Sequence, residues 1–68
     1  MSEDLLREVV SNIVESADEV KRSGTRNDLD YGKLLAYAEA LSAIRDTYDG
    51  DLSKIGLDFD IDKRYLYS

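Results

Sequence analysis

Two stretches of the 68-residue chain, residues 3–22 and 28–48, carry apolar side chains at helical spacing, and only the five polar residues 23–27 join them. Alternating steps of three and four residues place side chains on one face of an α-helix. Helices joined by so short a link are antiparallel neighbours. The sequence therefore predicts a mainly α protein, a single small domain over residues 1–68 built on an antiparallel helical hairpin.

The two apolar stripes define the candidate core. We expect their members either in the core of the hairpin or in a dimer interface. They are Leu6, Val10, Ile13, Ala17, Val20, Leu34, Tyr37, Leu41, Ile44 and Tyr48.

Local signals mark where each helix starts and stops. Ser2 is a suitable N-cap for the first helix, and Gly24 follows its last turn. Asn27 or Asp28 caps the second helix, and the glycine of Asp49-Gly50 is expected to close it. Gly32 costs roughly 1 kcal/mol against alanine inside a helix, so the second helix alternatively begins one turn later.

The C-terminal residues 51–68 follow a different pattern and are expected to form an extended strap or a tail. Residues 51–56 resemble a single capped turn ended by glycine. Leu57, Phe59 and Ile61 then alternate with aspartates, which is the period of a half-buried strand. Because no second strand is indicated, this segment either pairs with its own copy or packs extended over the open end of the hairpin. We favour extended packing, followed by one helical turn or a frayed end.

The small size of the chain favours self-association. A domain of about 60 residues buries only about 60 % of its unfolded surface, and this chain has no cysteine for disulfides. A hairpin alone would leave part of Leu5, Val9, Tyr31 and Leu35 in water. Docking two hairpins into a four-helix bundle would bury both arcs in one symmetric interface. The competing arrangement is a monomer in which the C-terminal segment fills the open side, with Phe59 in place of the second hairpin.

Small residues form a ridge on the back of the second helix. The ridge consists of Gly32, Ala36, Ala40 and Ala43. It would let another helix approach closely and is therefore a candidate contact surface. Alanine is also the best helix former and occurs at exposed sites for that reason alone, so both interpretations stay open.

The composition argues against several classes of function. The formal charge is −6, from 15 acidic and nine basic residues, and there is no histidine or cysteine. An acidic surface without a basic stripe disfavours direct binding to nucleic acid or to anionic membranes. No nucleophile stands beside a base and no glycine-rich phosphate loop is present, so we expect a non-catalytic protein without cofactors. The missing cysteine fits a reducing cytoplasm.

Two groups of residues are candidates for a partner surface. Asp4, Glu8, Glu15 and Glu19 fall within a narrow arc of the first helix. This acidic stripe either is an ordinary solvent face or docks a basic partner. Tyrosines are frequent in binding hot spots, so Tyr65 and Tyr67 either anchor a partner or pack back on the hairpin.

A metal site is a weaker alternative. The spacing of Asp58, Asp60 and Asp62 matches the first carboxylates of an EF-hand loop. However, Lys63 stands where that loop requires glycine, and the alternation is equally typical of a solvated strand face.

The leading functional hypothesis is a cytoplasmic, homodimeric protein–protein interaction or regulatory module, whose partners are a second copy and an unidentified protein. One alternative is an acidic inhibitor or immunity-type protein that masks a basic nucleic-acid-binding site. Such binding would weaken steeply with salt and would depend on the acidic stripe. The second alternative is a metal-binding module that uses the three aspartates.

Overall fold

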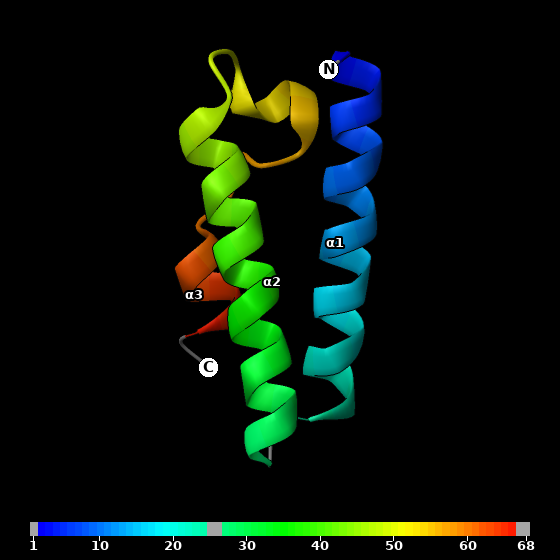
Figure 1. The fold of residues 1–68 in the computed structure, drawn as a ribbon, viewed down its shortest axis with the longest axis vertical. Helices are drawn as coiled ribbons and strands as arrows, with labels where there is room; N and C mark the ends of the chain where they lie inside the picture. Colours follow the sequence, from blue (N-terminus) through cyan, green and yellow to red (C-terminus); the bar gives the residue numbers. More distant parts are fainter. Residues whose placement is uncertain (1, 25–26, 67–68) are drawn as a thin grey trace.

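The computed structural model describes residues 2–24 and 27–66 and shows two long helices packed side by side (Figure 1). Helix α1 covers Glu3–Ser23 and helix α2 covers Asp28–Thr47. They run in opposite directions along the long axis of the molecule. The predicted antiparallel helical hairpin is therefore confirmed.

The predicted caps of α1 are present. The Ser2 Oγ accepts a hydrogen bond from the backbone N–H of Leu5 at 3.1 Å. Gly24 ends the helix with a φ of 96°, a value that favours glycine because it has no Cβ. Its backbone N–H donates to the carbonyl oxygen of Lys21.

Helix α2 begins where its cap predicts and ends differently from the prediction. The Asn27 Oδ1 accepts from the N–H of Asp30 at 2.8 Å, so the helix starts at Asp28 and includes Gly32. The predicted closing glycine is wrong, because Tyr48 caps the helix and Gly50 has no positive φ. Gly50 instead leaves space for the Tyr48 ring. A Cβ there would lie 2.8 Å from the Tyr48 ring.

Residues 51–56 form the predicted capped turn, the 3-10 helix η1 over Leu52–Ile55. The Asp51 Oδ1 accepts from the N–H of Ser53 at 3.0 Å. Gly56 closes the turn in the left-handed conformation, with a φ of 80°. Ile55 thereby reaches the core with no exposed surface.

The strand-like pattern of residues 57–61 does not produce a strand in the described part of the chain. Leu57 is buried and Phe59 half-buried in irregular backbone, and Ile61 opens a short helix, α3, at Ile61–Tyr65. The Asp60 Oδ1 caps α3 by accepting from the N–H of Lys63 at 3.1 Å. A helical turn pairs its own backbone groups, whereas a lone strand leaves them unpaired. Leu57, Phe59 and Ile61 pack on the core as expected, but the predicted extended strap is wrong, because the backbone bends at Phe59 and is helical from Ile61.

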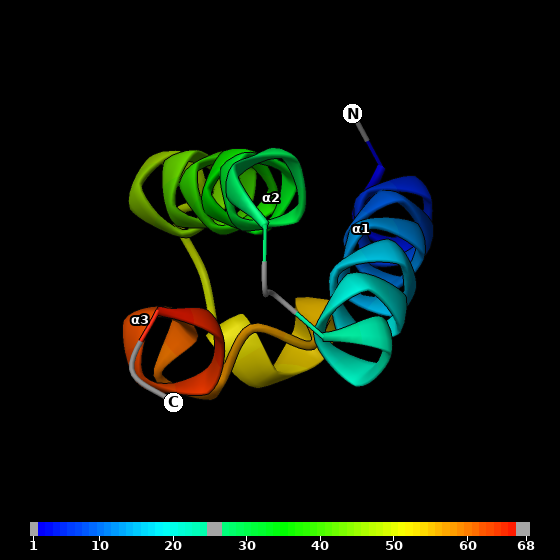
Figure 2. The same ribbon diagram turned by 90° about the horizontal axis from the view of Figure 1, so that it is seen from below.

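The C-terminal segment, residues 51–66, covers one side of the hairpin (Figure 2). Seen end-on, η1 lies beside α1 and α3 lies below α2, at different levels along the long axis, and the other side of the hairpin has no such cover. Side chains from all four elements form one core. Its buried members are Val10, Ala17, Leu34, Ala38, Leu41, Ile55, Leu57, Ile61 and Tyr65.

The C-terminal segment packs on the hairpin as in the competing arrangement predicted from the sequence, but its buried members are Ile55, Leu57, Ile61 and Tyr65, and Phe59 is only half-buried. The described residues contain no helix that is long and apolar enough to cross a membrane.

Candidate protein-interaction site

The C-terminal segment is fastened to α1 by a cluster around Asp18. The Arg64 Nη2 donates to Asp18 Oδ2 at 2.8 Å, and the Tyr65 hydroxyl donates to Asp18 Oδ1 at 3.0 Å. The Lys21 ammonium donates to the carbonyl oxygen of Arg64. Since α3 also packs against α2, these bonds hold the short helix to both members of the hairpin.

Aromatic contacts complete this cluster. The Arg64 guanidinium carbon lies 4.9 Å from the centre of the Phe59 ring, within cation–π range. Phe59 and Tyr65 pack edge to face with their ring centres 6.3 Å apart. Phe59 thus shields the ion pair from one side while itself staying half-buried.

The environment of the cluster shifts three pKa values, and the hydrogen bond to Asp18 raises that of Arg64. Burial raises the pKa of Tyr65 to about 12, and the hydrogen bond to Asp18 acts in the same direction. Partial burial works against ionisation of Asp18, but the hydrogen bonds from Arg64 and Tyr65 outweigh it and hold the Asp18 pKa below its ordinary value. The cluster therefore keeps a neutral tyrosine and a charged carboxylate at neutral pH.

A second set of contacts joins the N-terminal half of α1 to the end of α2 and to η1. The Tyr48 hydroxyl donates to Glu3 Oε2 at 2.8 Å, and this hydrogen bond raises the pKa of Tyr48. The Arg7 Nε donates to the carbonyl oxygen of Lys54 at 2.8 Å. These contacts fix the Tyr48 ring over Gly50.

The structure separates the residues predicted for a partner surface. The acidic stripe of Asp4, Glu8, Glu15 and Glu19 is exposed along α1. Tyr65 is only 4 % exposed, so it packs back on the hairpin and is not available to anchor a partner. Its ring replaces water over the core while its hydroxyl keeps a partner in Asp18. Tyr67 lies outside the described residues.

The two predicted apolar stripes lie where the core meets the edge of the hairpin. Val10, Ala17, Leu34 and Leu41 are buried. The other six members are half-buried, and they are Leu6, Ile13, Val20, Tyr37, Ile44 and Tyr48. The hairpin and the C-terminal segment together therefore do not cover the stripes completely.

The uncovered side of the hairpin, here called the open face, is bordered by one helical stripe from each long helix. The α1 stripe is Leu5, Val9, Asn12, Ser16, Glu19 and Ser23. The α2 stripe is Leu29, Lys33, Ala36, Ala40, Ala43 and Thr47. At about 100° per residue, the α1 stripe lies on roughly the opposite side of its helix from Arg7 and Asp18, which contact the C-terminal segment.

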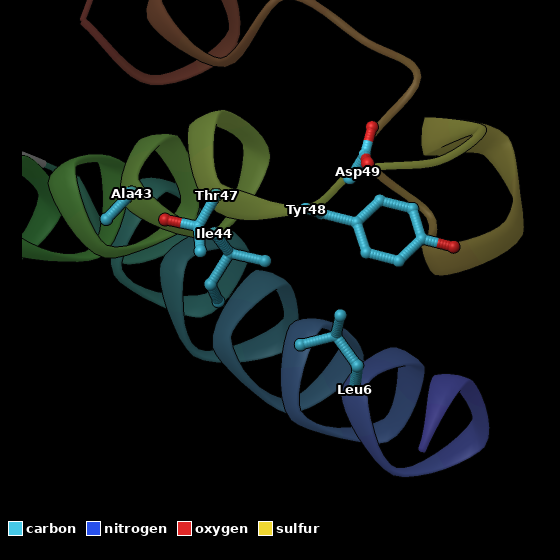
Figure 3. Close-up of a pocket in the computed structure, with 6 residues that line it drawn as sticks. All are labelled: Leu6, Ala43, Ile44, Thr47, Tyr48 and Asp49. Carbon is cyan, nitrogen blue, oxygen red and sulfur yellow. The ribbon is translucent and has the colours of Figure 1, made fainter. Parts of the chain in front are cut away.

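Two surface pockets lie between α1 and α2 on the open face. Ala43 and Thr47 of the α2 stripe line the larger, of about 540 Å³, together with Leu6, Ile44, Tyr48 and Asp49. Figure 3 shows Leu6 and Ile44 pointing toward each other across it, with the Tyr48 ring at one end. The smaller pocket, of about 340 Å³, lies toward the other end of the hairpin and includes Ser16, Glu19, Ser23 and Lys33.

The open face differs from the rest of the molecule in charge. Charged residues make up 35 % of the chain, yet the twelve residues of the two stripes include only Glu19 and Lys33. All six members of the α2 stripe are exposed, and so are four members of the α1 stripe. Ordinary solvent-facing helix surfaces carry charged residues, so this face is unusual for one that stays in water.

The metal alternative finds no support in the geometry. In residues 2–24 and 27–66 no three carboxylates are grouped so that they could hold an ion. Asp60 caps α3 and Asp62 lies within it, so the strand alternation that would place the aspartates on one face is absent.

The sequence predicted part of the open face and missed part of it. The ridge of Gly32, Ala36, Ala40 and Ala43 is fully exposed and contributes three residues to the α2 stripe. The sequence analysis did not include Leu29 and Thr47 in that stripe. The available signal is spacing, because Leu29 lies four residues before Lys33 and Thr47 lies four residues after Ala43. Asp18 and Arg64 were also missed, because residues 46 positions apart leave no local pattern.

Comparison of the chain with protein-family models, with curated proteins and with solved structures finds no match, so the argument for its function rests on the open face and its surroundings.

Proposed function

We propose that this chain is a non-catalytic protein-interaction module of the cytoplasm that works as a homodimer through the open face. The observation that carries the proposal is the contrast between the two sides of the hairpin. One side is covered by the chain's own C-terminal segment, and the other presents a mainly apolar pocket between two stripes that carry almost no charge.

Charge supports a second copy as the partner. Each chain carries a net charge of −6, so most ways of joining two copies would bring acidic residues together. The two stripes that border the open face reduce this repulsion, since they carry one acid, Glu19, and one base, Lys33, and only Asp30 and Asp49 add acidic groups at its pockets. Face-to-face docking of two hairpins there gives a four-helix bundle, with each C-terminal segment on the outside.

The dimer would leave the acidic stripe of α1 largely in solvent. Asp4, Glu8 and Glu15 are exposed and lie outside the two stripes that border the open face. They would remain accessible to a further, basic protein partner. The absence of histidine and cysteine from the chain supports a binding role rather than catalysis.

Sedimentation equilibrium over a wide concentration range tests the proposal. The wild-type chain is expected to reach twice its mass of 7.7 kDa. The variant Ala40→Glu places a charge in the middle of the α2 stripe, where two copies meet near their symmetry axis. We expect it to raise the dimer dissociation constant at least about tenfold.

The variant Ser11→Glu is the matched control, because it adds the same charge at an exposed site of α1 outside the open face. It should dimerise like the wild type. A wild-type chain that stays at its monomer mass at every concentration would refute the proposal, and so would equal effects of the two variants.

A further inference from the structure

We infer that the larger pocket of the open face receives the Leu29 side chain of a second copy, with the two chains related by a two-fold axis across the middle of α2. This inference rests on the proposed homodimer, and it specifies which residues of the open face meet. The contact would form twice, once at each end of the dimer.

The pocket has the character of an apolar side-chain site. Leu6 from α1 and Ile44 from α2 form its floor, and the Tyr48 ring closes one end (Figure 3). The ring is held in place by its hydrogen bond to Glu3, at 2.8 Å. Ala43 and Thr47 border the pocket without filling it.

Leu29 has the properties of the side chain that would fill it. It is 70 % exposed, a larger fraction than the 49 % of Leu5 or the 48 % of Tyr31. A leucine left in water at a helix start gains free energy by burial in an apolar pocket. Leu29 also lies in the first turn of α2, at the opposite end of the helix from the pocket.

Leu29 and the pocket face the same way. Leu29 and Thr47 are 18 residues apart, which is five helical turns and a rise of about 27 Å. Both side chains therefore lie on one line along α2, and Thr47 borders the pocket. A protruding side chain and a pocket at opposite ends of one face are self-complementary under a two-fold axis that lies in the plane of that face and runs perpendicular to α2.

The centre of the α2 stripe fits this arrangement. With Leu29 of one copy opposite Thr47 of the other, the axis passes at the level of Ala38, and Ala36 faces Ala40 of the second copy. Small side chains at this point allow the two α2 helices to approach closely. In this dimer the exposed small-residue ridge packs against the α2 helix of the second copy. Helix propensity alone does not explain such a role.

The size of the face is adequate for a stable dimer. The molecule spans 36 × 18 × 14 Å between Cα atoms. A face of 36 by 18 Å has a projected area of about 650 Å², close to the roughly 800 Å² of surface that each partner buries in typical stable interfaces.

Engineered cysteines test this register, because the chain has none of its own. The double variant Leu29→Cys/Thr47→Cys should form a disulfide-linked dimer in a mild redox buffer. The two positions cannot be bridged within one chain, because they lie about 27 Å apart and a disulfide needs Cα atoms within about 7 Å. Both sites are exposed, so the substitutions leave the fold intact.

The matched control is Leu29→Cys/Asp46→Cys, in which the second cysteine moves by one residue and about 100° around the helix. Asp46 is also exposed. We expect cross-linking of the first variant to exceed that of the control at least about tenfold, because only its cysteines would be held together. Equal or absent cross-linking of both variants would overturn the inference.

Sedimentation of the same proteins under reducing conditions separates the two proposals. A reversible dimer without selective cross-linking would leave the homodimer standing and refute only the Leu29 contact. A monomer at every concentration would refute both.

Discussion

At the scale of single residues, two glycines of this chain have opposite roles. Gly32 lies inside α2 with nothing within 4 Å of the place where a Cβ would stand. Gly50 lies against the Tyr48 ring, and a Cβ there would come within 2.8 Å of it. Glycine therefore lowers helix stability at residue 32, whereas at residue 50 it leaves room for the Tyr48 ring.

Replacing each glycine by alanine should change stability in opposite directions. Gly32→Ala is expected to raise the free energy of unfolding by about 1 kcal/mol, because alanine loses less backbone entropy in a helix. Gly50→Ala is expected to lower it by about 1 kcal/mol, because the new methyl group displaces the ring from its hydrogen bond to Glu3. Urea denaturation of both variants checks this, and a loss of stability in Gly32→Ala would contradict it.

The Tyr65 hydroxyl should make the stability of the fold decrease at alkaline pH. Its pKa is raised to about 12 from an ordinary 10.0, so it stabilises the fold fully below pH 10 and this contribution is lost between pH 10 and 12. Tyr65→Phe is expected to cost about 1 kcal/mol at neutral pH and to reduce the alkaline loss of stability. Tyr48, whose pKa is also raised, would supply the remaining slope.

Tyr31→Phe is the control for this measurement, because it makes the same change at a side chain that is 48 % exposed. Thermal unfolding followed at a series of pH values between 7 and 12 compares the variants with the wild type. The interpretation fails if Tyr65→Phe keeps the full alkaline loss of stability.

At the scale of elements, the C-terminal segment is part of the core rather than a tail. Ile55, Leu57 and Ile61 have almost no exposed surface, and they cover the side of the hairpin that contacts η1 and α3. The hydrogen bonds of Asp18 to Arg64 and Tyr65 then set where α3 lies along α1.

Truncation of one buried side chain in this segment should therefore be costly. Ile61→Ala is expected to lower the free energy of unfolding by about 3 kcal/mol, the usual range for a buried isoleucine. Lys63→Ala, at an exposed site of the same short helix, should change it by less than about 0.5 kcal/mol. Urea denaturation at low, constant protein concentration keeps dimerisation out of the comparison. Similar small losses in both variants would indicate a frayed tail.

At the scale of the whole molecule, the chain covers the apolar surface of its hairpin on one side only. Helical stripes as wide as these need cover on both sides, and the short C-terminal segment covers only one. The open face is left with an apolar pocket, the exposed Leu5 and Leu29, and little charge along its two stripes. The proposed dimer follows from this incomplete cover rather than from any single motif.

Local patterns were sufficient for the two long helices and for their caps at Ser2, Gly24 and Asn27, but not for the end of α2. Ser2, Asn27 and Gly24 act on backbone groups within a few residues, so their effects can be predicted from neighbours alone. The prediction failed at residues 57–61, where the alternation of apolar residues suggested a strand. Leu57, Phe59 and Ile61 are buried or half-buried as expected. However, Asp60 caps the short helix α3, and the described residues contain no second strand with which this segment could pair.

The sequence by itself determined the hairpin and the ends of α1, because short-range hydrogen bonds and helical periodicity decide these features, and it narrowed the start of α2 to two neighbouring turns. Only the tertiary structure decided that Tyr65 is buried, that Gly50 supports the Tyr48 ring and that one face of the hairpin stays open. These features depend on contacts such as Asp18–Arg64 and Glu3–Tyr48, which join residues more than 40 positions apart. Such contacts form only when the whole chain has packed, so no local pattern records them.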